Sequence, residues 1–170
     1  MDARVRRATA EDAHAIASVQ VASWRVGYAD VFPADFLAGL SVDERLELWK
    51  RVLSDGGYEI FVAEGDGRVA GFASAGPTED AEGTGTRGEL FALYVEPTAW
   101  GKGLGSALLV RAEEALREAG FDEATLWVLK DNPRARTLYA RAGWKPDGGR
   151  KLLTDPGIDA AVIRYRKRLV

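Results

Sequence analysis

The chain has 170 residues, a length typical of one domain with its own hydrophobic core, and carries 26 acidic against 23 basic residues. A net charge of −3 gives no overall field that favours nucleic acid, and the absence of cysteine excludes disulfides, thiolate metal sites and a thiol nucleophile. No apolar run is long enough to cross a membrane and the start is not signal-like, so we expect a cytoplasmic protein without membrane, nucleic-acid or metal partners.

The first residues predict a short strand followed by a helix. The strand is expected over residues 5–8. Thr9 and Asp12 then have the spacing of a capping box, in which each side chain binds the other residue's backbone N–H. We therefore expect a helix from this point to about Ser23.

A second capping box, Ser41 with Glu44, predicts another helix that runs to about Leu53. Between the two helices, residues 24–39 are too aromatic to be an idle linker, because they contain Trp24, Tyr28, Phe32 and Phe36.

Residues 59–63 and 68–75 predict a hairpin. Gly65-Asp66-Gly67 between them has the chemistry of a tight turn of the primed type or its bulged relative. The segment that follows, residues 76–88, has almost no apolar side chain, and we expect it to be a mobile loop.

The most informative segment follows this loop. A strand is predicted over residues 88–95, and a proline turn then leads to three alternate glycines at 101–105. These glycines open an amphipathic helix that runs to about Ala119 and is ended by Gly120. Glycines at a helix N-terminus let an anion approach the backbone N–H groups, so the loop favours a phosphate ligand.

Viewed alone, the glycine loop leaves alternatives open. A dinucleotide site needs G-x-G-x-x-G and an acidic residue about 20 residues on, whereas the spacing here is G-x-G-x-G and the next strand ends in Lys130. The P-loop pattern G-x-x-x-x-G-K-[ST] does not occur. The glycines could also serve only a tight turn and close helix packing.

The remaining elements complete the predicted sheet. A buried strand over residues 124–129 is followed by Asn132 and by a helix over 133–142, closed by a glycine and a tryptophan. Strands near 151–154 and 161–169 finish the chain, and the basic residues of the last strand are predicted to form its solvated face.

This order of elements resembles the GNAT superfamily of acyl-CoA-dependent N-acyltransferases. The superfamily's pyrophosphate motif, [QR]-x-x-G-x-[GA], falls on Trp100 to Gly105, and Trp100 is its one departure. The second motif, N-x-x-[AS]-x-x-x-Y-x-x-x-G-[FW], matches Asn132 to Trp144 without a mismatch. The matched core covers about a third of the chain, and the order of the other elements also fits.

The resemblance implies an α/β fold: a mixed, mostly antiparallel central sheet with helices on both faces and a splay between its two central parallel strands. It also implies one N-acetyltransferase domain over residues 1–170. Acceptor-side helices are expected in 1–58, the acetyl-CoA-binding core in 59–144 and C-terminal strands in 145–170.

Acetyl-CoA is the co-substrate that the resemblance implies. The glycine loop would bind the pyrophosphate through its backbone, and an open strand edge would pair with the pantetheine amides, with the Leu93 N–H polarising the thioester carbonyl. Asn132 would cap the last helix and contact the pantetheine arm. The expected cofactor-binding residues are Leu93, Tyr94, Val95, Gly101, Lys102, Gly103, Leu104, Gly105, Ser106, Asn132 and Tyr139.

Two residues are expected to act in catalysis. Glu89, at the start of the strand that leads to the loop, matches the glutamate base of histone-acetylating relatives, which commonly works through water; alternatively it is a surface carboxylate. Tyr139 fits the position of the family's general acid toward the leaving thiolate; alternatively it is a core tyrosine. The one histidine, His14, is remote from both motifs.

The acceptor site is expected where the first helix ends, formed by Trp24, Tyr28 and Phe32, with Glu89 at the reacting amine. Aromatic faces near carboxylates suit a cationic amine with some apolar surface, although aromatic residues at helical spacing also form plain core. The carboxylates expected nearby are Glu79, Asp80 and Glu82.

We therefore expect an N-acetyltransferase that moves an acetyl group from acetyl-CoA directly to a primary amine of a small molecule or amino-acid-like metabolite. The alternatives are a protein N-terminal or lysine acetyltransferase, a non-catalytic acyl-CoA-binding module, and a nucleotide-binding interaction domain. The sequence leaves a homodimer open and indicates no metal site.

Overall fold

The computed structural model describes residues 4–80, 87–155 and 158–170. Seven strands of this part form one sheet in the order β1-β2-β3-β4-β5-β7-β6. The elements in chain order are β1 (Arg4–Arg7), α1 (Ala13–Gly27), α2 (Ala34–Ala38), α3 (Val42–Asp55), β2 (Glu59–Gly65), β3 (Arg68–Pro77), β4 (Gly88–Val95), α4 (Leu104–Glu118), β5 (Glu123–Leu129), α5 (Pro133–Arg141), β6 (Lys145–Asp155) and β7 (Ile158–Arg168). None of the described helices has both the length and the apolar character that a membrane crossing needs.

The sheet is antiparallel except at its centre, where β4 and β5 run parallel. These two strands are in register only from Gly88 to Leu90 on β4 and from Ala124 to Leu126 on β5. On its other side, β4 stays paired with β3 as far as Val95. The second half of β4 therefore has an unpaired edge toward β5, which confirms the predicted splay.

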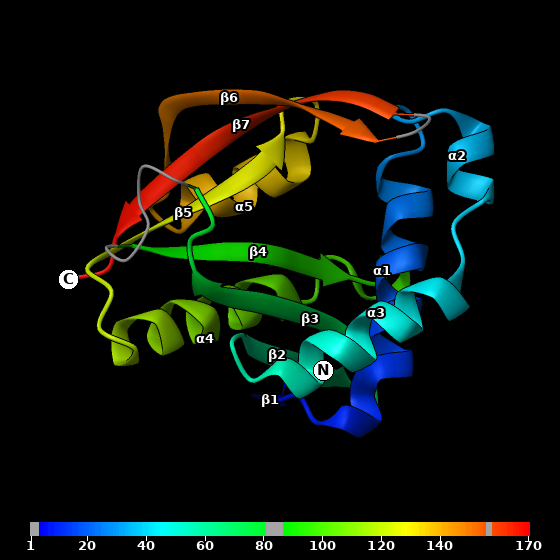
Figure 1. The fold of residues 1–170 in the computed structure, drawn as a ribbon, viewed down its shortest axis with the longest axis horizontal. Coiled ribbons are helices and arrows are strands. Elements are labelled where there is room, and N and C mark those ends of the chain that lie inside the picture. Colours follow the sequence, from blue (N-terminus) through cyan, green and yellow to red (C-terminus); the bar gives the residue numbers. More distant parts are fainter. Residues whose placement is uncertain (1–3, 81–86, 156–157) are drawn as a thin grey trace.

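Helices cover both faces of the sheet (Figure 1). The helix α4 buries Leu104 and Leu108 against one face, while α1 and α3 bury Ile16 and Trp49 against the other. A third apolar cluster joins the end of α1, α2 and the β6–β7 hairpin, and its buried members are Tyr28, Phe32, Leu37, Leu129, Ile158, Ala160 and Val162.

The first predicted capping box is present, and of the second only the hydrogen bond to the Ser41 side chain is found among the described residues. The Asp12 carboxylate accepts the Thr9 backbone N–H at 2.7 Å, and the Ser41 hydroxyl accepts the Glu44 N–H at 3.3 Å. The first helix continues past Ser23 to Gly27, because no residue before that glycine disfavours helix, so Trp24 lies on α1.

The loop prediction for residues 76–88 is wrong at both ends. Gly76 and Pro77 belong to β3 and pair with the start of β4. Arg87 is 3% exposed, and its guanidinium donates to the Thr125 hydroxyl at 3.2 Å, so the approach to β4 is fixed by a buried cation. Residues 81–86 lie outside the described residues.

The prediction that the basic residues of the last strand are solvated is wrong for Arg164, Arg166 and Lys167, while Arg168 is exposed as predicted. The strand β7 lies between β5 and β6 rather than at the edge of the sheet. Ion pairs consequently join Arg164 to Asp147 at 2.8 Å, Arg166 to Glu123 at 2.8 Å and Lys167 to Glu113 at 2.9 Å.

Candidate active site

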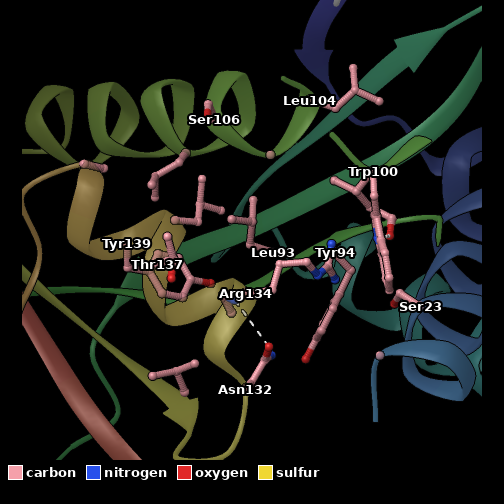
Figure 2. A pocket seen from close by; sticks show the side chains of 18 of the residues that line it. Ser23, Leu93, Tyr94, Trp100, Leu104, Ser106, Asn132, Arg134, Thr137 and Tyr139 are labelled. Carbon is pink, nitrogen blue, oxygen red and sulfur yellow. Dashed lines mark hydrogen bonds between the residues drawn. The ribbon is translucent and has the colours of Figure 1, made fainter. Parts of the chain in front are cut away.

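A cavity of about 820 Å³ opens where β4 and β5 separate. It is lined by residues 90–95 of β4, residues 127–129 of β5, the glycine loop with the start of α4, and α5. At one end it reaches Ser23 and Tyr28 near the end of α1. Figure 2 shows Leu93 and Tyr94 of β4 facing Asn132 and Tyr139 across this opening. One cavity therefore connects the glycine loop with the predicted acceptor side.

Backbone conformation explains two of the glycines in the loop. Gly101 and Gly103 have φ angles of 77° and 85°, in the left-handed region that side chains disfavour. Gly105 has no such angle, and a Cβ there would make an ordinary contact with Leu138 of α5 at 3.4 Å.

The N-terminus of α4 is open to a ligand. Its N-cap is Gly103, and no side chain caps the first N–H groups of the helix. Leu104 is 1% exposed, so only its backbone is available to a ligand, while Lys102 and Ser106 are exposed. Uncapped N–H groups and the positive end of the helix dipole together make a site suited to phosphate.

Backbone geometry identifies the groups of β4 that face the gap. The Glu96 N–H donates to Ala70 on β3 at 2.8 Å, so the Val95 carbonyl, on the other side of the same planar peptide, points toward the opening. Alternation along the strand directs the N–H and C=O groups of Leu93 to the same side, and those of Tyr94 toward β3. The Trp100 indole N–H already occupies the Val95 carbonyl at 2.7 Å.

Two predicted residues lie on α5 beside this edge. The Asn132 side-chain oxygen accepts the Ala135 N–H at 3.3 Å and caps the helix as predicted (Figure 2). Tyr139 belongs both to the core and to the cavity lining, with its ring centroid 6.4 Å from those of Trp144 and Tyr165. Burial raises the pKa of Tyr139, so its hydroxyl stays protonated and able to donate.

Glu89 lies at the closed end of the splay, where β4 still pairs with Thr125 of β5. Its carboxylate is buried and accepts the Thr78 hydroxyl at 2.6 Å. Burial raises the pKa of Glu89, the charge of Asp80 adds to this effect, and the Thr78 hydrogen bond opposes it. The surface-carboxylate alternative is therefore wrong, because the Glu89 side chain is buried.

A β-bulge separates Glu89 from the open part of β4. Ala75 pairs with Leu90 and Ser74 with Ala92, so Phe91 is the extra residue. Leu90 and Phe91 line the cavity, whereas Glu89 lies just beyond it. The bulge thus marks the point where β4 changes from a paired strand to an open edge.

The structure brings Trp24, Tyr28 and Phe32 together, with ring centroids 5.1 to 5.8 Å apart. Of the three, Tyr28 lines the cavity. Burial and the neighbouring Tyr94 raise the pKa of Tyr28, which stays a hydroxyl donor. Phe32 is 4% exposed in the cluster with α2 and the β6–β7 hairpin, so its role is structural.

The carboxylates predicted to face a cationic amine are already engaged. Asp80 accepts the Trp127 indole N–H at 3.1 Å and the Arg87 guanidinium at 3.2 Å, and Arg164 lies 3.6 Å away. Glu79 accepts the Tyr58 hydroxyl at 3.2 Å. The charge-based part of the acceptor prediction is therefore wrong for Asp80, and Glu82 lies outside the described residues.

Sequence reasoning missed Arg134, which lines the cavity. Its guanidinium carbon stands 3.3 Å from the centroid of the Trp100 ring. Arg134 occupies a wildcard position of the second motif, so the motif alone gave no signal. The departure at Trp100 was the one available clue, since a ring cannot supply the contacts of the Gln or Arg expected there.

The cavity combines the groups that acyl transfer from a phosphorylated thioester needs. It offers an uncapped helix N-terminus for phosphate, an open strand edge for amides and a backbone N–H for a polarised carbonyl. Tyr139 supplies a protonated hydroxyl inside the cavity, and Glu89 supplies a buried carboxylate beside it.

Comparison with known proteins agrees with this geometry. The model of the acetyltransferase (GNAT) family matches residues 20–144. YuaI of Bacillus subtilis (strain 168), an uncharacterised N-acetyltransferase, is 40% identical over 130 residues, which cover 76% of this chain and 73% of that protein. The mycothiol acetyltransferase of Kineococcus radiotolerans is 40% identical over 111 residues, which cover 65% of this chain and 34% of that protein.

Solved structures share the whole fold. The PaiA N-acetyltransferase from Thermoplasma acidophilum, solved in complex with coenzyme A, superposes with a TM-score of 0.75 at 23% identity and covers 99% of both chains. The chain spans about a third of the length of the mycothiol acetyltransferase it matches. The family match, the splayed parallel strands and the uncapped glycine loop lead to one conclusion: this chain belongs to the acetyltransferase (GNAT) family.

Proposed function

We propose that the protein transfers an acetyl group from acetyl-CoA directly to the primary amine of a small molecule. The observation that carries this proposal is the single cavity that runs from the uncapped N-terminus of α4, along the open edge of β4, to Tyr28. Its path fits an extended thioester whose phosphates lie at the glycine loop. The coenzyme A complex of the Thermoplasma PaiA enzyme supports the same choice of donor.

The donor end of the reaction uses backbone groups. The pyrophosphate accepts N–H groups of residues 101–106, and the pantetheine amides pair with the open-edge groups of Leu93 and the Val95 N–H. The Leu93 N–H is directed toward the gap, where it polarises the thioester carbonyl and stabilises the oxyanion that forms on amine attack. The Val95 carbonyl already accepts the Trp100 indole N–H, which takes one of its two acceptor positions.

The acceptor amine must lose a proton before it attacks. An alkylammonium with a pKa near 10.4 pays about 4.6 kcal/mol to deprotonate at pH 7, at roughly 1.36 kcal/mol per pKa unit. Glu89 is the base: its raised pKa strengthens it as a proton acceptor, and one water carries the proton from the cavity past the bulge at Phe91.

Collapse of the tetrahedral intermediate then releases the CoA thiolate. Tyr139 donates a hydrogen bond to the sulfur, since burial raises its pKa and keeps the hydroxyl protonated. A thiol with a pKa near 8.5 is already a good leaving group, so this donation accelerates the reaction less than it would for an alkoxide.

The elements that cover the acceptor side of the cavity favour a small acceptor over a peptide. The β6–β7 hairpin and α2 meet in one apolar cluster next to the end of α1 (Figure 1). Leu37 of α2 and Ile158 of β7 are both buried in it. An extended peptide needs an open trough on this side, whereas a compact amine needs only the space beside Tyr28.

The test offers a panel of acceptor amines together with acetyl-CoA and measures turnover by the release of the coenzyme A thiol. We expect turnover with one class of small primary amines and, in the same assay, none with peptides that present a free N-terminus or lysine. Acetylation found only on peptides or folded proteins would reject the small-molecule acceptor. Binding of acetyl-CoA without turnover on any amine would instead favour a non-catalytic module.

A further inference from the structure

Trp100, the residue that departs from the family motif, lines the cavity and is held there by contacts with two other elements. The Trp100 indole N–H donates to the Val95 carbonyl at 2.7 Å, which ties the ring to the end of β4. The ring also packs at the end of α1, where a Cβ on Gly27 would lie 3.9 Å from two of its carbon atoms. Trp100 is therefore a fixed platform directly before the glycine loop.

Arg134 lies on this platform. Its guanidinium carbon is 3.3 Å from the ring centroid, and both residues line the same cavity as the glycine loop (Figure 2). One helical turn later on the same face of α5, Leu138 lies 3.4 Å from the Cβ position of Gly105. This face of α5 is therefore turned toward the start of α4.

Arg134 also lacks a negative partner in the described part of the chain. Among the described side chains of residues 4–80, 87–154 and 158–170, no carboxylate oxygen lies within 4.0 Å of its guanidinium. Stacking on the indole fixes the plane of the guanidinium while leaving its N–H edges free. A guanidinium without a carboxylate partner among the described residues, in the same cavity as an uncapped helix N-terminus, suits a phosphate, which it can bind through two parallel hydrogen bonds.

We propose that Arg134, held on Trp100, binds a phosphate of coenzyme A and supplies the side-chain contact that the motif position itself has lost. The inference rests on the proposed function, because it assumes that acetyl-CoA is the donor. The positive charge then comes from Arg134 on α5 instead of from the glycine loop, so the phosphate is bound from both sides of the cavity. The donor is thereby selected for its phosphates as well as for its thioester.

The test compares donors that differ in phosphate content. Acetyl-CoA, acetyl-dephospho-CoA and S-acetylpantetheine are offered to the parent protein and to Arg134→Gln, and the dissociation constants are measured by calorimetry. We expect Arg134→Gln to weaken acetyl-CoA binding on the order of tenfold to a hundredfold and to leave S-acetylpantetheine within about twofold. Arg134→Lys should recover part of the loss, because lysine keeps the charge without the planar fork.

Two controls separate this contact from other effects. Arg51→Gln removes one exposed positive charge on α3 and should leave all three dissociation constants unchanged. Trp100→Leu removes the platform and should weaken acetyl-CoA binding in the same direction as Arg134→Gln. Unliganded melting temperatures equal to that of the parent would show that each variant is folded.

The three donors also show which phosphate of coenzyme A is bound by Arg134. A loss that persists with acetyl-dephospho-CoA assigns Arg134 to the pyrophosphate, and a loss that disappears assigns it to the 3′-phosphate; either supports the proposal. Equal losses with S-acetylpantetheine, unchanged acetyl-CoA binding, or a change confined to the acceptor's Michaelis constant would overturn it. Failure of the parent protein itself to bind acetyl-CoA would reject the proposed function instead.

Discussion

Gly103→Ala separates the cofactor role of the glycine loop from its structural role. Gly103 is the N-cap of α4 with φ at 85°, and no atom lies within 4 Å of the place where a Cβ would stand. Alanine in this left-handed conformation costs about 1–2 kcal/mol, which lowers the melting temperature of a chain of this size by roughly 2–8 °C. Because the added methyl meets no protein atom, we expect the variant to fold.

Gly120→Ala is the matched control at the other end of α4. Gly120 has φ at 95° and equally empty surroundings, and it does not line the cavity. Both variants should therefore lose a similar amount of stability. Only in Gly103→Ala does the new methyl group stand at the helix N-terminus, where it displaces the phosphate from the N–H groups.

The measurement is thermal melting with and without acetyl-CoA. At a hundredfold excess over its dissociation constant for the parent, acetyl-CoA stabilises the fold by about 2.7 kcal/mol, or roughly 5–11 °C. This shift should be kept in Gly120→Ala and largely lost in Gly103→Ala. Equal shifts in the parent and both variants would refute the assignment of the phosphate to this loop.

Three further substitutions test the proposed roles of single groups. Glu89→Gln should lower activity most below the acceptor's pKa, with partial recovery as the pH rises, and a pH-independent loss would reassign Glu89 to structure. Burial raises the pKa of Glu89, so the folded state loses stability as the pH rises through that pKa. Glu89→Gln should therefore unfold at a higher denaturant concentration than the parent at neutral pH, and at the same concentration in acid. Tyr139→Phe should reduce turnover on the order of 10- to 1000-fold while acetyl-CoA binding by calorimetry stays nearly intact, and unchanged turnover would leave it a core residue. Tyr28→Phe removes one hydroxyl from the cavity lining and should raise the acceptor's Michaelis constant about fivefold, with no effect on acetyl-CoA; an effect on both substrates would contradict an acceptor role.

The seven strands and the four longer helices of the described residues were predicted, because their signals are local, although only residues 151–154 of β6 (Lys145–Asp155) were expected to be strand. Ser41 and Asn132 cap helices with their own side chains, and Asp66-Gly67 form a primed turn with φ angles of 55° and 78°. The extent of the first helix and the five-residue α2 were not predicted. The short helix α2 depends on packing against the distant strands β6 and β7, which leaves no local pattern, whereas α1 continues as far as Gly27 because no earlier residue disfavours helix.

The sequence motifs predicted those parts of the candidate site that depend on backbone conformation. They missed the parts that depend on contacts between charged side chains from different elements. The spacing of the glycines at 101–105 favoured a phosphate site, and the family resemblance then identified the loop and implied the cap at Asn132. Two contacts bring together residues that are distant in sequence. Asp80 pairs with Arg87 and Arg164, and the Arg134 guanidinium lies over the Trp100 ring. Composition gives the number of such charges, but only the fold determines their partners.

The most direct test of the account is a crystal structure of the protein with a non-hydrolysable acetyl-CoA analogue. We expect its pyrophosphate on the N–H groups of residues 101–106, its pantetheine between β4 and β5, and its carbonyl oxygen within hydrogen-bond distance of the Leu93 N–H. The Tyr139 hydroxyl should point at the sulfur, and the acyl group should face the cavity end at Tyr28. An analogue bound outside the splay of β4 and β5, or with its carbonyl turned away from Leu93, would contradict the account.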